Sequence, residues 1–374
     1  MKKILILANH FITIYAFRKE LVEELIKDGN EVFLALPESK DNTFFSEMGC
    51  KLINTPLDRR GTNPISDMKL LLQYIRIIKK SKPDIILTYT IKPNIYGGIA
   101  SRICKSKVIH TVTGLGSVYI QDMWQKEIVV LLNRLAFKKA SKIYFLNEDN
   151  EKFYKKLKII SSNNDTAIVP GSGVNLEKFK YMELLPTSKI TFTFIGRILK
   201  DKGIEEFLFA AKILINKYNN VKFQVVGFVD EKKYIELLDR YQKKGIIEYL
   251  GKRDDIPKIM AESTCIVLPS YGEGRGTVLQ EGAAIGRALI TCDTYGCKEN
   301  VEEGYNGFLC KVADPESLTC AMEKFIKLSH EEKVLMGMRS RKKAEIEFDR
   351  NIIVNEYMQG IKKILKVGVT NESI

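Results

Sequence analysis

The chain has 374 residues, of which 45% are hydrophobic and 28% are charged, and its formal net charge is +13. This length exceeds what one ordinary hydrophobic core uses, so we expect two domains of about 150–200 residues each. No apolar run reaches the roughly 18 residues of a membrane span, and no cleavage site follows the apolar N-terminus. These features argue against an integral membrane or secreted protein and predict a cytoplasmic one.

Short β-rich segments alternate with longer amphipathic ones in the first half of the chain. Residues 16–29, for example, have a helical pattern that ends in Asp-Gly, as helices commonly do. Alternation of this kind predicts a parallel sheet with helices on both faces. The expected strands are 2–8, 31–36, 51–55, 84–90, 107–113, 142–147 and 166–171.

The same alternation then restarts. Residues 175–189 have no clear period and contain a proline, which indicates a linker, and helical patterns end the chain from about 314 to 366. We therefore predict an α/β protein with two Rossmann-like, doubly wound domains that face a cleft, with ligands at the carboxyl ends of the strands. The expected strands of the second domain are 190–196, 221–227, 246–251, 264–269, 287–292 and 307–310. The predicted divisions are 1–175, 190–350 and a C-terminal helix over 351–374.

Cysteine usage and charge narrow the class of protein further. The seven cysteines are odd in number and form no C-x-x-C pair, so we interpret them as reduced, mostly buried residues. Residues 1–180 hold 29 Lys and Arg against 18 Asp and Glu, whereas residues 181–374 hold 30 against 28. This excess predicts that the first half meets a phospholipid surface, a lipid diphosphate or nucleic acid. No zinc finger, RNP-type pattern or basic tail supports nucleic acid.

The stretch FIGRILKDKG (194–203) combines a strand end with two cations. The strand is expected to end at Gly196, Arg197 follows it, and Lys202 lies near the start of a helix that opens around Asp201. Cations at a strand's carboxyl end, beside a helix N-terminus, suit a diphosphate. A solvated arginine and lysine on a loop are the alternative interpretation.

The stretch GEGRGTVLQEG (272–282) carries two glutamates eight positions apart. Its glycines allow close approach of a ligand, and a helix is expected to begin near Thr277. Glu281 then lies about one turn inside the helix, where a carboxylate can accept hydrogen bonds from adjacent ribose hydroxyls. Glu273 in the turn can face another part of the same ligand. A capping and a surface carboxylate would produce the same spacing.

Together, G-R-x-x-x-x-K and E-x7-E resemble the family-four glycosyltransferases of the GT-B fold, and the resemblance covers essentially the whole chain. It implies a retaining, metal-independent hexosyltransferase without a cofactor, whose C-terminal helix crosses back to the first domain. It also implies that Arg197 and Lys202 hold the donor diphosphate, Glu273 contacts the donor sugar and Glu281 binds the ribose. The implied further donor-site residues are Gly196, Gly274, Arg275, Gly276 and Thr277, with Lys252 and Arg253 against the base.

Motifs in the first domain are similar to those of a bacterial subgroup that extends surface glycans on undecaprenyl diphosphate. The subgroup includes enzymes similar to the N-acetylgalactosaminyltransferase of the Campylobacter N-glycan pathway. The motifs are DRRGTNP (58–64), YTIKPNIYGG (89–98), VTGLGSVYI (112–120) and PGSGVNLEKF (170–179). The resemblance implies a UDP-sugar donor, such as an N-acetylhexosamine, a polyprenyl-diphosphate-linked acceptor and a peripheral position on the inner membrane. The implied acceptor-site residues are Tyr15, Arg18, Lys92, Thr113, Gly114 and Gly116.

The sequence departs from this family at two places. Thr113 occupies the place of a common cleft histidine, and we interpret His110, three residues earlier, as structural. Arg275-Gly276 stands where relatives often have Phe-Pro, which leaves the donor sugar open to another hexose or a uronic acid.

Other functions fit the sequence less well. A nucleotide-sugar epimerase of similar architecture is the main alternative, and a two-domain sugar-binding protein is a second. The chain has no D-x-D, no H-E-x-x-H, no G-x-S-x-G and no G-x-G-x-x-G after a first strand, which argues against a metal-dependent GT-A enzyme, a zinc hydrolase, an α/β-hydrolase and a dehydrogenase. Residues 126–142 could form a basic amphipathic helix at a membrane or a core-packing helix with a solvated end.

Overall fold

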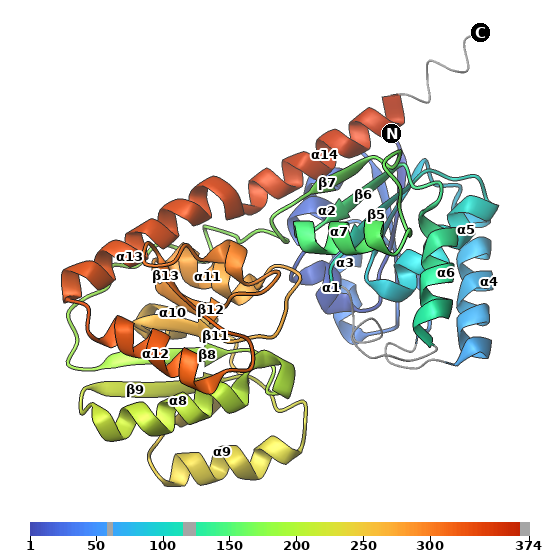
Figure 1. The fold of residues 1–374 in the computed structure, drawn as a ribbon. Coiled ribbons are helices and arrows are strands. Elements are labelled where there is room, and N and C mark those ends of the chain that lie inside the picture. The colour runs from blue at the N-terminus through green and yellow to red at the C-terminus, as the bar shows by residue number, and fades with distance from the viewer. Residues whose placement is uncertain (58–62, 115–124, 367–374) are drawn as a thin grey trace. The chain divides into compact units, whose positions relative to one another are not determined.

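The computed structural model describes residues 1–57, 63–114 and 125–366. Contacts divide the chain into two compact units. The first unit contains Met1–Ser172 and the chain from Asn351 onward, and the second contains Gly173–Arg350. Each unit is built on its own sheet (Figure 1). Among the residues described, no helix combines the length and the apolar character that crossing a bilayer requires.

The sheet of the first unit has seven strands in the order β3-β2-β1-β4-β5-β6-β7, and every pair is parallel. All seven expected strands are present at the predicted places. The strands are β1 Lys3–Leu7, β2 Glu31–Leu36, β3 Lys51–Asn54, β4 Ile85–Tyr89, β5 Val108–Val112, β6 Lys142–Phe145 and β7 Thr166–Ile168. The central strands β1, β4 and β5 are almost wholly buried because helices cover both of their faces.

Helices form two layers on this sheet. Side chains of α4, α5, α6 and α7 share buried clusters with one face, whereas α1, α2, α3 and α14 supply the buried cluster on the other. The helical pattern expected over 16–29 is α2, which ends with Asp28 as its C-cap and is preceded by the separate short helix α1. The helices are α1 Phe11–Tyr15, α2 Lys19–Lys27, η1 Lys40–Asn42, α3 Thr43–Glu47, α4 Pro64–Ser81, the π-helical turn η2 Pro93–Gly97, α5 Gly98–Ile103, α6 Gln125–Phe137, α7 Glu148–Lys156 and α14 Arg350–Lys366.

The C-terminal helix α14 completes the core of the first unit. Tyr357 is buried, its ring centroid lies 4.3 Å from that of Tyr144, and its hydroxyl shares a 2.8 Å hydrogen bond with Thr111 of β5. Lys107 donates to the carbonyl oxygen of Ile364 at 2.8 Å. The return of the C-terminal helix to the first domain, which the family resemblance implies, is thus present in the structure.

The sheet of the second unit has six parallel strands in the order β10-β9-β8-β11-β12-β13. These also confirm the predicted segments. The strands are β8 Ile190–Ile195, β9 Val221–Val226, β10 Glu248–Gly251, β11 Cys265–Leu268, β12 Ala288–Cys292 and β13 Gly307–Cys310. The helices are η4 Lys200–Lys202, α8 Ile204–Lys217, α9 Lys233–Lys243, α10 Ile256–Glu262, α11 Thr277–Ile285, η5 Lys298–Asn300, α12 Pro315–Ile326, α13 His330–Lys343 and the π-helical turn η6 Ala344–Phe348.

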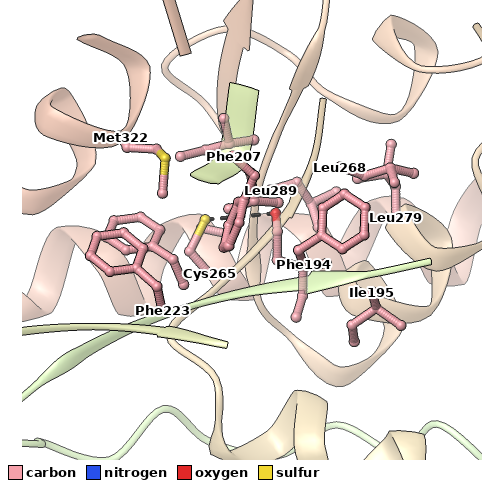
Figure 2. Close-up of a cluster of buried hydrophobic side chains, with 14 of the residues drawn as sticks. Phe194, Ile195, Phe207, Phe223, Cys265, Leu268, Leu279, Leu289 and Met322 are labelled. Atoms are coloured by element: carbon pink, nitrogen blue, oxygen red, sulfur yellow. Dashed lines mark hydrogen bonds between the residues drawn. The ribbon is translucent and has the colours of Figure 1, made fainter. Parts of the chain in front are cut away.

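One continuous hydrophobic core holds the second unit together. Figure 2 shows Phe194 and Phe207, which belong to β8 and α8, and the rings of this pair lie 5.6 Å apart between centroids. Cys265 lies in the same cluster, and all seven cysteines of the chain are free thiols, five of them buried. The expectation that most of the cysteines are buried is therefore confirmed.

The segment expected to be a linker packs on the second unit. Val174 donates its amide to the carbonyl of Phe348 at 2.7 Å, and Met182 donates to that of Ile285 at 3.0 Å. The buried guanidinium of Arg287 donates to the carbonyl oxygen of Met182 and, at 2.6 Å, to that of Ala261. These contacts explain why residues from Gly173 onward belong to this unit.

His110 lies in the middle of the first sheet and is fully buried. Its ring stacks on Phe137 at 4.4 Å, and its Nδ1 lies 2.7 Å from the hydroxyl of Thr88, which in turn donates to Asn94 at 2.6 Å. Burial lowers the pKa of His110 to about 3, and the backbone of Ala136 has a smaller effect that raises this pKa. A neutral, packed histidine fits the structural interpretation of this residue.

We expect the unfolding free energy to fall as the pH drops below about 6.5, because the unfolded chain then binds a proton that folded His110 excludes. This group contributes a slope of up to about 1.4 kcal/mol per pH unit, down to the folded pKa of about 3. Urea unfolding of His110→Gln between about pH 4 and 7 should show a shallower slope than the wild type. Substitution of the partly exposed His330 by Gln is the control. An unchanged slope in the His110 variant would contradict the assignment of a low pKa to folded His110.

Candidate functional site

The carboxyl ends of the central strands β8 and β11 meet at one edge of the second sheet. Strand β8 ends at Ile195, and Gly196 follows it. A Cβ on Gly227, which follows the neighbouring strand β9, would lie 1.7 Å from the carbonyl oxygen of Gly196. Only glycine at 227, with φ +146°, allows the two backbones to approach this closely.

Two turns pack against each other at this edge. Gly203 has φ +74°, and a Cβ there would lie 2.1 Å from the carbonyl oxygen of Pro269. The carbonyl oxygen of Asp201 accepts from the amide of Tyr271 at 2.9 Å and from the hydroxyl of Ser270 at 3.0 Å. The turn that carries Lys202 is therefore fixed, backbone to backbone, on the turn that carries Glu273.

This packing brings two of the predicted residues into direct contact. Lys202 Nζ donates to Glu273 Oε1, and the side chains of the pair are only 18% and 16% exposed. The loop after β12 also holds Glu273, because the amide of Glu273 donates to the carbonyl oxygen of Tyr295 at 3.1 Å. A Cβ on Gly296 would lie 2.0 Å from the carbonyl oxygen of Glu273, so this glycine allows the loop after β12 to close against the turn.

Arg197 projects from the same edge with its side chain 49% exposed. Its guanidinium donates to Asp230 at 3.0 Å, and Asp230 follows the neighbouring strand β9. Both predicted diphosphate ligands thus bear a carboxylate partner in the structure. An incoming diphosphate would take the place of these carboxylates, so each cation would still have an anionic partner.

The helix α11 begins at Thr277, as predicted, with Gly276 as its N-cap at φ +53°. Glu281 is its fifth residue, and burial raises the pKa of this carboxyl to about 7, while Lys178 and Arg350 act in the opposite direction. Within the described residues, no hydrogen bond or ion pair reaches the Glu281 carboxylate. It can therefore accept hydrogen bonds from a ligand's hydroxyl groups.

Arg275 lies in the turn with its guanidinium carbon 6.0 Å from the Phe348 ring centroid. Burial lowers its pKa, opposed by the nearby carboxylates of Glu299 and Glu347. The buried amide of Asn300 donates to the carbonyl oxygens of Arg275, Gly296 and Cys297 at 3.0–3.2 Å. Asn300 therefore holds the turn that leads to Gly276.

The predicted base-binding residues lie in the turn after β10. Lys252 is exposed, and Arg253 makes a bidentate pair with Asp255 at 2.8 and 2.7 Å. Gly274 lies between Glu273 and Arg275 in the glycine-rich turn.

The predicted acceptor residues lie in the first unit. Tyr15 is 44% exposed, and its ring stacks on Phe11 with centroids 5.0 Å apart. Lys92 pairs with Asp67 at 2.7 Å. Thr113 and Gly114 directly follow β5, so they lie at the carboxyl edge of the first sheet, whereas Gly116 lies outside the described residues.

Arg18 differs from the other predicted acceptor residues because it is 3% exposed. Its guanidinium lies 5.0 Å from the Tyr89 ring centroid and 5.2 Å from that of Tyr357, and it donates to the carbonyl oxygen of Phe17 at 2.7 Å. In this arrangement Arg18 joins α14 to the rest of the first unit instead of facing solvent.

Sequence reasoning missed the residues that hold the turns in place. Ser270 and Tyr271 follow β11, whereas Tyr295 and Asn300 follow β12, and only their side-chain and backbone contacts reveal the role. The run DTYGCKEN (293–300) could have indicated this role, because a glycine and an asparagine there follow a buried strand.

Two family models match the chain. The model described as "Glycosyl transferase 4-like" matches residues 3–147, and the one described as "Glycosyl transferases group 1" matches residues 177–343. The chain belongs to glycosyltransferase family 4. Family membership makes this protein a glycosyltransferase, of a family that retains anomeric configuration.

Curated relatives of this glycosyltransferase span nearly the same length. The chain is 28% identical to the N,N'-diacetylbacillosaminyl-diphospho-undecaprenol alpha-1,3-N-acetylgalactosaminyltransferase of Campylobacter jejuni, over 95% of this chain and 96% of the relative. It is 29% identical to the capsular polysaccharide biosynthesis glycosyltransferase CapM of Staphylococcus aureus, over 82% and 84%. It is also 29% identical to an Escherichia coli UDP-Gal:alpha-D-GlcNAc-diphosphoundecaprenol alpha-1,3-galactosyltransferase, over 78% and 79%.

Solved structures establish the fold of this glycosyltransferase. Anabaena HepE in complex with UDP and glucose superposes with a TM-score of 0.78 at 18% identity, covering 97% of this chain and all of that one. A glycosyltransferase from Rickettsia africae superposes with a TM-score of 0.79 at 18% identity, covering 98% and 99%. The predicted GT-B fold is confirmed.

We expect Gly203→Ala to lower the unfolding free energy by about 3 kcal/mol or more, since a Cβ there meets the Pro269 backbone as well as the strain of a positive φ. Gly245 is the matched control: its φ is +67°, and a Cβ there would meet no atom within 4 Å. Gly245→Ala should lose only about 1 kcal/mol. Equal losses by chemical denaturation would mean that the contact between the turns contributes nothing to stability.

Proposed function

We propose that this glycosyltransferase moves a sugar from a UDP-sugar onto a polyprenyl-diphosphate-linked saccharide at the cytoplasmic face of the membrane. An N-acetylhexosamine such as GalNAc is the favoured donor sugar, because the Campylobacter relative carries that name over almost its whole length. The observation that carries the proposal is the contact of Lys202 with Glu273 at the carboxyl ends of β8 and β11. It joins the two motifs on which the donor-site interpretation depends.

In this interpretation Lys202 and Arg197 bind the donor diphosphate and stabilise the negative charge that grows on it as the glycosidic bond breaks. Glu273 exchanges its contact with Lys202 for hydroxyl groups of the sugar. Glu281 accepts from the ribose hydroxyls, and Lys252 with Arg253 lie against the base. Gly196, Gly274 and the backbone of Arg275, Gly276 and Thr277 allow the sugar and phosphates to approach the main chain.

The acceptor contacts in the proposed function come from the first unit. Tyr15 and Lys92 contact the acceptor diphosphate, and Thr113 and Gly114, together with Gly116, line the acceptor side. Burial of Arg18 between two tyrosine rings supports a positioning role for it, in which it fixes α14 and the start of α2. No general base is assigned, since the donor phosphate can take the acceptor proton in a front-face reaction.

Lys202→Ala should lower kcat by about 100- to 1,000-fold, because the loss of one group that stabilises transition-state charge costs about 3–4 kcal/mol. UDP release would be measured with a panel of UDP-hexoses, UDP-N-acetylhexosamines and UDP-uronic acids, with and without EDTA, and with a short polyprenyl-diphosphate-linked aminosugar. The neighbouring exposed Lys200 is the control, and Lys200→Ala should retain activity. Acceptor-dependent release that the Lys202 variant retains in full would refute the donor-site assignment.

UDP affinity should rise about ten-fold between about pH 6 and pH 8, because Glu281, with a pKa of about 7, accepts hydrogen bonds best when it is ionised. Glu281→Gln cannot ionise and should lose this dependence. Calorimetric titration of both proteins with UDP gives the ratio of their affinities at each pH. The protonation of the UDP phosphate affects both proteins alike, so it does not change this ratio. A ratio that does not change with pH would show that Glu281 does not contact the ribose.

A further inference from the structure

Three neighbouring strands of the second sheet end in the same way. A glycine lies at the carboxyl end of β8, β9 and β10, and the residue after it is Arg197, Phe228 and Lys252 in turn. The amide of Gly227 donates to the carbonyl oxygen of Gly251 at 2.9 Å, which joins the ends of β9 and β10. Because β9 lies between the other two strands, Phe228 lies between the two cations along the carboxyl edge of the sheet.

The backbone of Phe228 is fixed, although its side chain is not part of the core. Its carbonyl oxygen accepts from the amide of Ile198 at 2.9 Å, and the hydroxyl of Tyr249 donates to the carbonyl oxygen of Gly227 at 2.9 Å. The next residue, Val229, packs against the hydrophobic core, whereas Phe228 is 47% exposed. The chain therefore presents a large ring to solvent from a rigid part of the backbone.

The ring of Phe228 is open to a ligand. Within the part of the chain that the structure describes, no aromatic ring and no cation stacks on it. A single exposed apolar side chain is common on protein surfaces, so the inference depends on the position of this one. An aromatic ring on a rigid backbone, with cations on both sides, is an arrangement on which a nucleobase can stack.

The spacing of the strand ends agrees with the length of a nucleotide. In the proposed function Arg197 binds the diphosphate and Lys252 lies against the base, and only β9 separates their two strands. Neighbouring strands lie about 4.8 Å apart, so the ends of β8 and β10 are about 10 Å apart. A nucleotide that has its diphosphate at one end and its base at the other passes over Phe228.

We propose that the base of the donor nucleotide stacks on the ring of Phe228, while Lys252 donates to an oxygen at the edge of the base. This inference rests on the proposed function, since it takes the donor to be a UDP-sugar. It gives a role to a residue outside the two motifs on which the donor-site interpretation depends. It also attributes much of the affinity for the nucleoside to stacking rather than to charge.

The test is calorimetric titration of the full chain with UDP and with inorganic diphosphate. Phe228→Ala should weaken UDP binding about 10- to 100-fold, the usual effect of removing an aromatic ring on which a base stacks. Its affinity for inorganic diphosphate should not change, because that ligand has no base. Phe228→Tyr keeps a flat ring and should bind UDP like the wild type, whereas Phe228→Leu is apolar without a flat ring and should bind UDP nearly as weakly as Phe228→Ala.

The matched control is Ile235, an apolar residue of α9 that is 55% exposed. Ile235→Ala should bind UDP like the wild type. Phe228→Ala should unfold in urea with nearly the free energy of the wild type, because its side chain is not part of the core. Equal losses of UDP and inorganic diphosphate binding in Phe228→Ala would indicate a structural role and overturn the proposal.

Fluorescence reports the stacking directly. The chain has one tryptophan, so Phe228→Trp introduces a second. UDP should quench the emission of this variant more strongly than that of the wild type, because a base in contact with an indole ring quenches it. Equal quenching in the two proteins would contradict contact between the base and position 228.

The results also separate this inference from the proposed function. If Phe228→Ala binds UDP as tightly as the wild type does, the stacking role is refuted and the donor assignment remains. If the wild type does not bind UDP, the proposed UDP-sugar donor and the stacking role are both refuted. Weaker UDP binding by Phe228→Ala, in a protein that transfers no sugar to the polyprenyl-linked acceptor, would support the stacking role and refute the proposed acceptor.

Discussion

The close packing of two turns at the carboxyl edge of the second sheet is the contact on which the candidate donor site depends. Gly203 lies against the carbonyl of Pro269, and Gly296 lies against that of Glu273, at distances that a Cβ would forbid. Because backbone rather than long side chains forms these contacts, the positions of Lys202 and Glu273 are set by rigid parts of the chain. Sites built this way lose little conformational entropy when a ligand binds.

In the first unit, a buried polar network has a comparable organising role. Thr88, Asn94 and His110 join β4, η2 and β5, and Thr111 joins β5 to Tyr357 of α14. Arg18 between two tyrosine rings extends this network to the start of α2. Most of these polar groups are fully buried and paired, so they specify one packing of the C-terminal helix on the sheet.

The two units differ in how their positively charged side chains are paired with acidic ones. In the second unit the two cations of the candidate donor site pair with carboxylates, Lys202 with Glu273 and Arg197 with Asp230. In the first unit the outward cations of α4 and α6 have few acids near them on the same helices. Exposed side chains of α4 and α6 therefore carry part of the net positive charge of the N-terminal half.

The thirteen strands of the described residues, their division between two sheets and the two motifs of the candidate donor site could all be predicted from the amino-acid sequence. Buried parallel strands are nearly continuous apolar runs, and glycine followed by charged residues marks their ends. Both patterns involve neighbouring residues, so they can be recognised in the sequence. The contact of Lys202 with Glu273 and the support of the turn by Asn300 and Tyr295 became visible only in three dimensions. The same holds for the burial of Arg18 and for the packing of the 173–189 segment on the second unit. Those outcomes depend on which distant loops pack together, and that is set by the order of strands in the sheet rather than by any local pattern.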